Sequence, residues 1–356
     1  MKTFFDIVIE SDFREDVYRR IASEIKEPLY KFTEKFPLLY KYRSLSVYAV
    51  DDLINGNVTA SAVSMYNDMF DGAMHGYGTV EERKNAAELE WKKIENLYEG
   101  CNITNNTIQK DYYVDLYKKH FKTEARLKFR QLDYLGTYGC CFSERNDSSL
   151  MWAHYADSSK GFCIEYDFNN WDKKCLQRYL LFPMAYSSKP INVSDWLEDD
   201  ADKYIKYPIE KAVLCAALNK SEVWAYEREW RLLYILPEIS EQFQRLPIKT
   251  LTIPSAVYFG YHFLKNFFYY ENRQTESCKN NIQNMLRLIE YIIQKNISVY
   301  IMAPSIGTYE QKALPIDAAQ LKMFMLEHFE DEEPKSMRYY YVVHDELMDI
   351  LEGVTD

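Results

Sequence analysis

Short runs rich in β-branched, aromatic and other apolar residues recur along the chain. They predict strands at residues 38–43, 57–61, 138–143, 161–166, 230–235, 250–253, 257–259 and 299–301. Apolar residues at helical spacing predict helices at about 12–26, 203–219, 276–295, 316–329 and 343–352. A short helix through Tyr48 and Leu53 is expected to stop at Asn55-Gly56. Because strands and helices interleave irregularly, the pattern predicts an α+β fold with a central mixed or antiparallel sheet.

The longest helical pattern covers residues about 80–132. Thr79 and Glu82 fit a capping box at its start, and a break at Gly100 to Thr107 separates two helices. We therefore expect a helical hairpin inserted into an α+β catalytic domain that spans residues 1–260. Residues 261–356 are expected to form an α-rich C-terminal extension that packs on this domain, with helices at its end.

Composition and charge narrow the classes of function. Of the 356 residues, 47% are hydrophobic and 27% are charged, which argues against disorder. The net charge of −11 repels phosphate backbones and argues against broad non-specific binding of nucleic acid, although a local basic groove is compatible with it. The 31 tyrosines are expected to serve packing, or to stack on a nucleotide or base.

The cysteines and the missing motifs exclude several other classes. Seven cysteines without a CxxC pair or zinc-type spacing favour reduced thiols, and no metal is predicted. The chain has no apolar run of 18 residues and no signal-like N-terminus, which predicts a cytoplasmic protein without a membrane partner. The motifs of P-loop NTPases, Rossmann dehydrogenases, α/β-hydrolases and zincins are all absent.

Four short segments combine polar and aromatic residues at high density. They are LYKYRSL at 39–45, MYNDMFD at 65–71, the run from CFSE at 141–144 through MWAHY at 151–155 to GFCIE at 161–165, and WAYEREWR at 224–231. In order and spacing they resemble the signature of a large bacterial family of uncharacterised function, often encoded beside phage-defence and toxin–antitoxin genes. The resemblance covers about residues 38–260 and departs from the family at Met69, where proline is usual.

This layout is remotely similar to the ADP-ribosyltransferase fold, in which three strands offer an Arg or His, a hydroxyl residue and a catalytic Glu. The resemblance implies Arg43, Ser143 and Glu229 as the catalytic residues. It also implies NAD as the substrate and a nucleic-acid or protein target, with an antitoxin or a defence-system protein as a possible partner. The residues expected to bind NAD are Lys41, Tyr42, Asn67, His154 and Tyr155.

The chemistry gives these residue types a reason to meet. Cleavage of the nicotinamide–ribose bond develops positive charge on the sugar, which a carboxylate stabilises, and the same carboxylate can deprotonate an incoming nucleophile. An arginine suits the pyrophosphate or ribose of the dinucleotide. Serine and tyrosine can orient the nicotinamide side.

Structural roles remain open for several of these residues. Arg43 is equally compatible with a surface ion pair, Ser143 with a strand-end cap, and His154 with a buried, hydrogen-bonded position. Glu165 and Glu227 remain alternatives to Glu229 as the catalytic carboxylate. If residues 227–231 form a strand, Glu227 and Glu229 share a face, and one of them is expected to pair with Arg231 or Lys220.

Two functions of other classes are also compatible with the sequence. The first is a nuclease-type effector in which Asp68, Asp71, Glu165 and Glu229 gather a divalent cation. The second is a non-catalytic sensor or partner-binding module that uses the tyrosine-rich surface.

Overall fold

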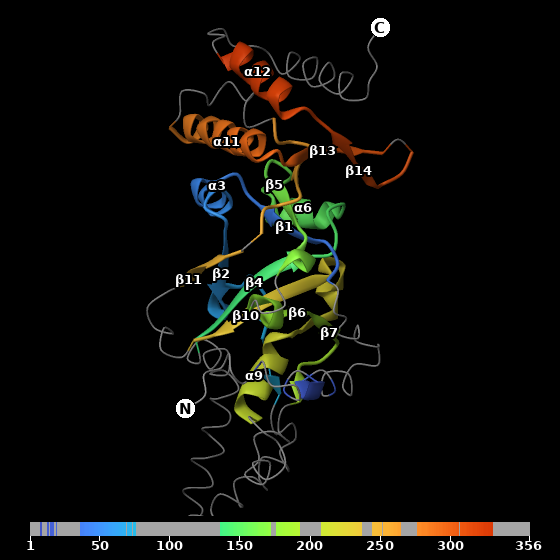
Figure 1. Cartoon of the computed structure of the whole chain (residues 1–356). Coiled ribbons are helices and arrows are strands. Elements are labelled where there is room, and N and C mark those ends of the chain that lie inside the picture. Colours follow the sequence, from blue (N-terminus) through green and yellow to red (C-terminus); the bar gives the residue numbers. More distant parts are fainter. Residues whose placement is uncertain are drawn as a thin grey trace, which may run out of the picture.

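A computed structural model describes residues 36–68, 70–72, 74–75, 136–171, 176–192, 208–236, 244–250, 252–264, 276–305 and 307–329, and positions 8, 13, 15–17 and 19. The helices predicted at about 12–26, 80–132 and 343–352 lie largely or wholly outside these residues and stay predictions. In Figure 1, α11 (Glu276–Lys295) and α12 (Ala318–Phe329) lie at one end of the described part, and α9 (Pro208–Ala217) lies at the other.

Among the described residues, ten strands form one sheet in the order β11-β2-β4-β1-β5-β12-β13-β14, with β10 pairing with β4 and β6. Its strands are β1 (Leu39–Arg43), β2 (Asn57–Ala62), β4 (Thr137–Ser143), β5 (Phe162–Tyr166), β6 (Leu181–Pro183), β10 (Glu229–Ile235), β11 (Arg245–Lys249), β12 (Ala256–Phe259), β13 (Ser298–Pro304) and β14 (Gln311–Pro315). Within this sheet β12 and β13 are parallel, and the other pairs are antiparallel. The predicted α+β class with a mixed sheet is confirmed.

Two short parallel ladders accompany the large sheet. β3 (Met74–His75) pairs with β8 (Ile191–Asn192), and β7 (Ala185–Ser187) pairs with β9 (Asn219–Ser221). The second ladder places Lys220 beside the segment that leads into β10, which becomes important for the cavity described below.

The helices begin and end where local chemistry dictates. Ser46 caps α3 (Val47–Ile54) by accepting a hydrogen bond from the Ala49 amide at 3.2 Å, and the helix stops at Asn55-Gly56, where Gly56 has φ +63°. Ser148 caps α6 (Ser149–Tyr155) in the same way. The remaining helical segments are α7 (Leu176–Leu180), η1 (Val63–Met65), η2 (Phe168–Asn170) and η4 (Glu222–Glu227).

One predicted strand is wrong. Residues 250–253 were expected to be extended, but the strand in this region is β11, which ends at Lys249 and pairs with β2. The Thr250 hydroxyl donates to the carbonyl oxygens of Gly56 and Thr252, which bends the chain away from the sheet. Pro254 follows and lacks an N–H group for a ladder hydrogen bond, so the sheet cannot continue through it.

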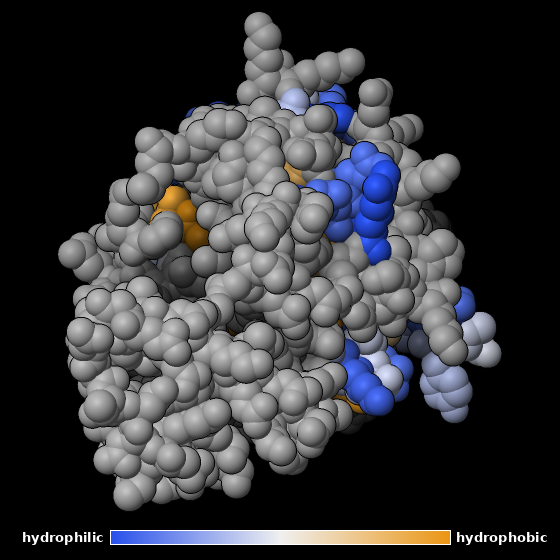
Figure 2. All heavy atoms as spheres, turned by 90° about the horizontal axis from the view of Figure 1, so that it is seen from below, coloured by the Kyte–Doolittle hydropathy of each residue, from blue (hydrophilic) through white to orange (hydrophobic). Residues whose placement is uncertain are grey.

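The domain boundary predicted at residue 260 falls within one continuous sheet. β12 precedes this residue and β13 follows it. The two strands pair directly in the sheet, and the crossover helix α11 connects them along the chain. One hydrophobic core includes Leu39 of β1, Ile164 of β5 and Met285 of α11. Seen from the α9 end, most of the coloured residues on that face are hydrophilic (Figure 2). No helix within the described ranges combines the length and apolar character needed to cross a membrane.

Candidate active site

The two edges of β4 pair with different numbers of strands, and a cavity lies on the side where two strands share the edge. One edge pairs with β10 along the whole strand, from Thr137↔Ile235 to Ser143↔Glu229. The other edge is shared between β2, which pairs at Gly139, and β1, which pairs at Ser143. Where β1 and β2 diverge, their side chains and those of β4 line a cavity of about 440 Å³. This volume lies within the ~300–1,000 Å³ typical of small-molecule sites.

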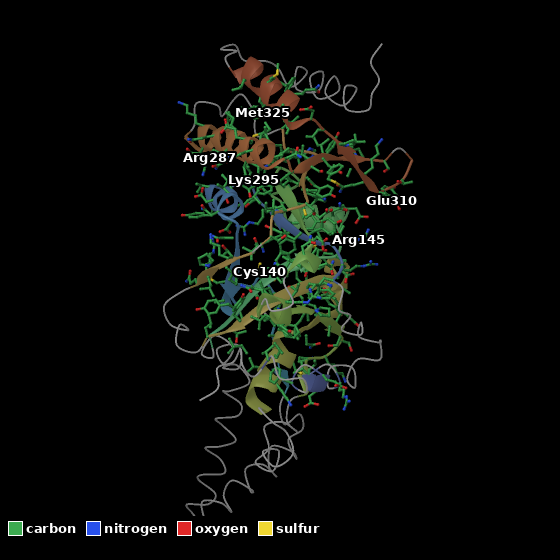
Figure 3. All side chains as sticks on the ribbon, in the orientation of Figure 1. Cys140, Arg145, Arg287, Lys295, Glu310 and Met325 are labelled. Atoms are coloured by element: carbon green, nitrogen blue, oxygen red, sulfur yellow. The ribbon has the colours of Figure 1, made fainter. Side chains whose placement is uncertain are left out.

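All the predicted site residues line this cavity. The three expected to be catalytic come from β1, β4 and β10 and are Arg43, Ser143 and Glu229. The five expected to bind NAD are Lys41, Tyr42, Asn67, His154 and Tyr155. The labelled Cys140 marks the position of β4 in Figure 3, and its neighbours Gly139 and Cys141 on the same strand line the cavity. The residues therefore converge, and the role of each stays a prediction.

Arg43 forms one wall of the cavity and is already paired. Its guanidinium donates to Asp52 of α3 at 2.9 Å, and the Thr59 hydroxyl of β2 donates to the same carboxylate oxygen at 2.6 Å. The Arg43 side chain keeps 22% of its surface exposed. The ion pair links β1, α3 and β2 across the divergence, so Arg43 holds the cavity open and still presents part of its surface to it.

Lys41 differs from Arg43 because no described carboxylate pairs with it. Its ammonium donates to the Cys141 carbonyl at 3.2 Å and contacts the Cys140 sulfur at 3.1 Å. It lies 5.2 Å from the centroid of the Phe142 ring. A lysine held by neutral groups at a cavity wall can neutralise an anionic part of a ligand.

Arg231 of β10 carries a fully buried guanidinium with five N–H groups, all of them used. Nη1 and Nη2 donate to the two carboxylate oxygens of Asp71 at 2.8 and 2.9 Å. Nε and Nη2 donate to Glu229 at 2.9 and 2.8 Å, and Nη1 also donates to the Ala217 carbonyl at 2.9 Å. Since no donor remains, Arg231 organises the cavity floor and is not available to a ligand.

Glu229 is held as a permanent anion. Besides the contacts to Arg231, its second carboxylate oxygen accepts a hydrogen bond from the Lys220 ammonium at 3.0 Å. Burial alone would raise the pKa of Glu229, but Arg231 and Lys220 lower it to about 2. The predicted catalytic carboxylate therefore lines the cavity as a fixed negative charge and is poorly suited to accept a proton.

Glu227 lies beside Glu229, and its pKa is shifted in the opposite direction. It ends η4, and Arg228 then turns the chain with φ +43° before β10 begins, so residues 227–231 are not one strand. The Glu227 carboxylate accepts hydrogen bonds from the Lys220 ammonium and from the Tyr155 hydroxyl, both at 2.6 Å. Burial raises the pKa of Glu227 above its ordinary value, and neighbouring Glu229 raises it further. The expected pairing with Lys220 or Arg231 is found for both carboxylates.

Two predicted residues have mainly structural contacts. The Ser143 hydroxyl is fully buried, donates to the Glu227 carbonyl at 2.6 Å and accepts from the Arg145 amide at 3.1 Å. The Tyr42 hydroxyl donates to the Arg145 carbonyl at 2.8 Å, and its ring packs edge-on against Trp152. Ser143 therefore behaves as a strand-end cap that positions Glu227, and Tyr42 packs α6 onto the sheet.

His154 was compatible with a buried structural position, and this expectation is wrong. Its side chain is exposed at the cavity wall on α6, next to Tyr155. Asn67 is also exposed, and its amide donates to the Tyr155 hydroxyl at 3.3 Å. These two polar side chains are accessible to a ligand that enters the cavity.

The four carboxylates of the nuclease alternative do not come together as one group. Glu165 lies outside the cavity lining, where it accepts hydrogen bonds from the Ser255 and Tyr258 hydroxyls, both at 2.7 Å. Asp71 and Glu229 are joined to each other through Arg231. Within the described residues, no group of three or more His, Cys, Asp or Glu side chains has the arrangement of a metal site.

The sequence did not single out Tyr66. Its hydroxyl is buried without a hydrogen-bond partner among the described residues, and its ring lies over the Arg231 guanidinium at 4.8 Å. A Cβ atom at Gly139 would lie 2.0 Å from this hydroxyl, so glycine is required there. Membership of the MYNDMFD segment was the available signal for Tyr66 and Asp71, but the partner of Asp71 could not be read from it.

Comparison with known proteins gives one match. Residues 151–232 are similar to a family described as "Protein of unknown function (DUF2971)". These residues run from α6 to the middle of β10 and include Tyr155, Glu227 and Glu229. No curated protein matches the chain at a significant level, and no solved structure does so.

Proposed function

We propose that the chain is an ADP-ribosyltransferase-like enzyme that cleaves NAD and transfers ADP-ribose to a nucleic-acid or protein target, as an effector of anti-phage defence or of a toxin–antitoxin pair. The observation that carries the proposal is a pair of adjacent carboxylates with opposite properties in one cavity. Glu229 is held ionised, with a pKa of about 2, and Glu227 has a raised pKa. Such divergence is typical of carboxylate pairs with separate catalytic tasks.

Glu229 suits the charge-stabilising task. When the bond between ribose and nicotinamide breaks, positive charge develops on the sugar, and a fixed anion nearby lowers the energy of that state. Arg231 and Lys220 hold the Glu229 carboxylate from two sides, so it does not have to reorganise during the reaction. In this proposal Glu229 keeps the charge-stabilising part of its expected role and not the deprotonation of the nucleophile.

Glu227 suits proton transfer. Its raised pKa brings it closer to neutral pH than an ordinary glutamate, and a catalytic base works best when its pKa is near the working pH. Ser143 holds the backbone of Glu227 in place through the 2.6 Å hydrogen bond to its carbonyl. In this proposal Ser143 is a positioning residue.

The cavity walls offer groups that fit a dinucleotide. Lys41 supplies a cation that pairs with no carboxylate among the described residues, which suits a pyrophosphate. Arg43 adds positive charge on the same strand, although it shares it with Asp52. Asn67 and His154 are exposed polar groups in the cavity lining and can bind ribose hydroxyls or the nicotinamide amide.

An ADP-ribosyltransferase-like fold is part of the same proposal. β1 and β10 both pair with β4, so Arg43, Ser143 and Glu229 lie on three neighbouring strands, and this arrangement supports the proposal. Ser143 and Glu229 are direct cross-strand partners.

The test is to incubate the purified chain with NAD and to measure the released nicotinamide by chromatography. We expect wild-type protein to release nicotinamide in the presence of EDTA, and Glu229→Gln to lose about 100-fold or more of the rate. Glu222→Gln is the matched control, since Glu222 is an exposed glutamate of η4 outside the cavity lining. A wild-type chain that releases no nicotinamide but cleaves nucleic acid in an EDTA-sensitive manner would overturn the proposal in favour of a nuclease.

A further inference from the structure

We propose that Tyr155 and Glu227 form a proton relay that takes up the proton of the group attacking the sugar. This inference rests on the proposed function and concerns the second half of its reaction. The Tyr155 hydroxyl donates to Glu227 Oε1 at 2.6 Å and accepts from the Asn67 amide at 3.3 Å. All three side chains line the cavity.

Tyr155 is the member of this chain that a nucleophile meets. Glu227 is only 3% exposed, and both of its carboxylate oxygens already accept short hydrogen bonds. Tyr155 is half-buried, and its hydroxyl has one proton and two acceptor lone pairs. The proton is used toward Glu227 and one lone pair toward Asn67, which leaves one lone pair for a donor in the cavity.

The charge balance around Lys220 explains why the proton ends on Glu227. The buried cluster holds three carboxylates, Asp71, Glu227 and Glu229, and two cations, Lys220 and Arg231. One negative charge is therefore in excess. Asp71 and Glu229 each contact both cations, whereas Lys220 is the one described cation that contacts Glu227, so Glu227 is the carboxylate whose charge is least compensated.

The step balances without any further reactant. The bond between the ribose carbon and the nicotinamide nitrogen breaks, and its electron pair leaves with neutral nicotinamide. An O–H or N–H group of the acceptor forms the new bond to that carbon. Its proton passes to the Tyr155 oxygen while the Tyr155 proton passes to Glu227, which ends as a neutral carboxylic acid.

The test compares Tyr155→Phe, Glu227→Gln and the double variant in nicotinamide release, with water as the acceptor. We expect each single variant to lose about 100-fold in kcat, and the double variant to lose no more than either, because the two groups act as one unit. NAD affinity should stay within about twofold of wild type. Tyr226→Phe is the control, since Tyr226 lies on η4 next to Glu227 but outside the cavity lining.

Azide supplies a readout that a structural role of Tyr155 would not change. It is an anion that attacks without losing a proton, so it should restore nicotinamide release by Tyr155→Phe and not by Glu229→Gln. Multiplicative losses in the double variant, or no rescue by azide, would overturn the relay. If wild-type protein is active and Tyr155→Phe is equally active, the relay alone falls; if wild-type protein releases no nicotinamide, the proposed function falls and the relay with it.

Discussion

Replacement of Arg231 by methionine tests whether the buried charge cluster holds the cavity together. Methionine has a similar length and removes the guanidinium together with its hydrogen bonds to Asp71, Glu229 and the Ala217 carbonyl. Asp71 and Glu229 are then left as buried carboxylates, 3% and 4% exposed, with only Lys220 between them.

The size of the effect follows from burial. Breaking a buried ion pair by removing one partner costs about 3–5 kcal/mol, because an uncompensated charge stays in the interior. The chain contains a matched exposed pair. Arg145 donates to both carboxylate oxygens of Asp147 at 2.7 and 3.1 Å, but these side chains are 41% and 44% exposed, against 1% and 2% for Arg231 and Asp71. Arg145→Met is therefore expected to cost about 0–1 kcal/mol.

The assay is urea unfolding of both variants, monitored by tryptophan fluorescence. The free energy of unfolding is calculated from the midpoint and the slope of the transition. A third variant combines Arg231→Met with Asp71→Asn and Glu229→Gln. It should recover part of the loss, since neutral side chains remove the unpaired charges. Equal losses for Arg231→Met and Arg145→Met, or a loss below about 1 kcal/mol for the former, would refute the reasoning.

Three further predictions concern the same cavity. Gly139→Ala brings a methyl group to 2.0 Å from the Tyr66 hydroxyl and should cost about 1–3 kcal/mol of unfolding free energy, part of which Tyr66→Phe restores in the double variant. Because its pKa is lowered from 4.5 to about 2, Glu229 should contribute about 3 kcal/mol of stability that is fully present above pH 4.5 and lost as the pH falls through 2. The unfolding free energy of Glu229→Gln should not show this decrease over the same pH range. Lys41→Met and Arg43→Ala should each weaken NAD binding about tenfold in calorimetry, and unchanged affinities would contradict their assigned roles. Lys41→Met should leave the melting temperature unchanged, whereas Arg43→Ala should lower it because it breaks the ion pair with Asp52.

Local signals predicted much of the fold. The helix after Ser46 and its end at Asn55-Gly56 follow from side-chain capping and from the left-handed backbone of Gly56, which are properties of neighbouring residues. The strand expected at residues 250–253 failed because the Thr250 hydroxyl bonds to Gly56, a residue distant in sequence, and this contact bends the chain. Sequence patterns near Thr250 contain no trace of it.

The site could be predicted as a set of residues but not as a set of roles. Segment resemblance brought Arg43, Ser143 and Glu229 together, and all of them line one cavity. Their partners decide what each can do, and those partners come from elsewhere in the chain. Asp71 lies 160 residues before Arg231, so the ion pair between them has no local signature. The Arg231 contact, which lowers the pKa of Glu229 against the effect of burial and does not reach Glu227, is equally invisible in sequence spacing.

The long sequence separation between Arg231 and Asp71 also determines when their ion pair can form during protein synthesis. The ribosome delivers Asp71 long before the guanidinium that neutralises it, and the Ala217 carbonyl shortly before. A nascent or truncated chain that ends before residue 231 lacks the guanidinium that pairs with both Asp71 and Glu229, and so cannot assemble the charged floor of the cavity. Translation products that end before residue 231 therefore lack the arrangement of charged residues on which any activity of this site would depend.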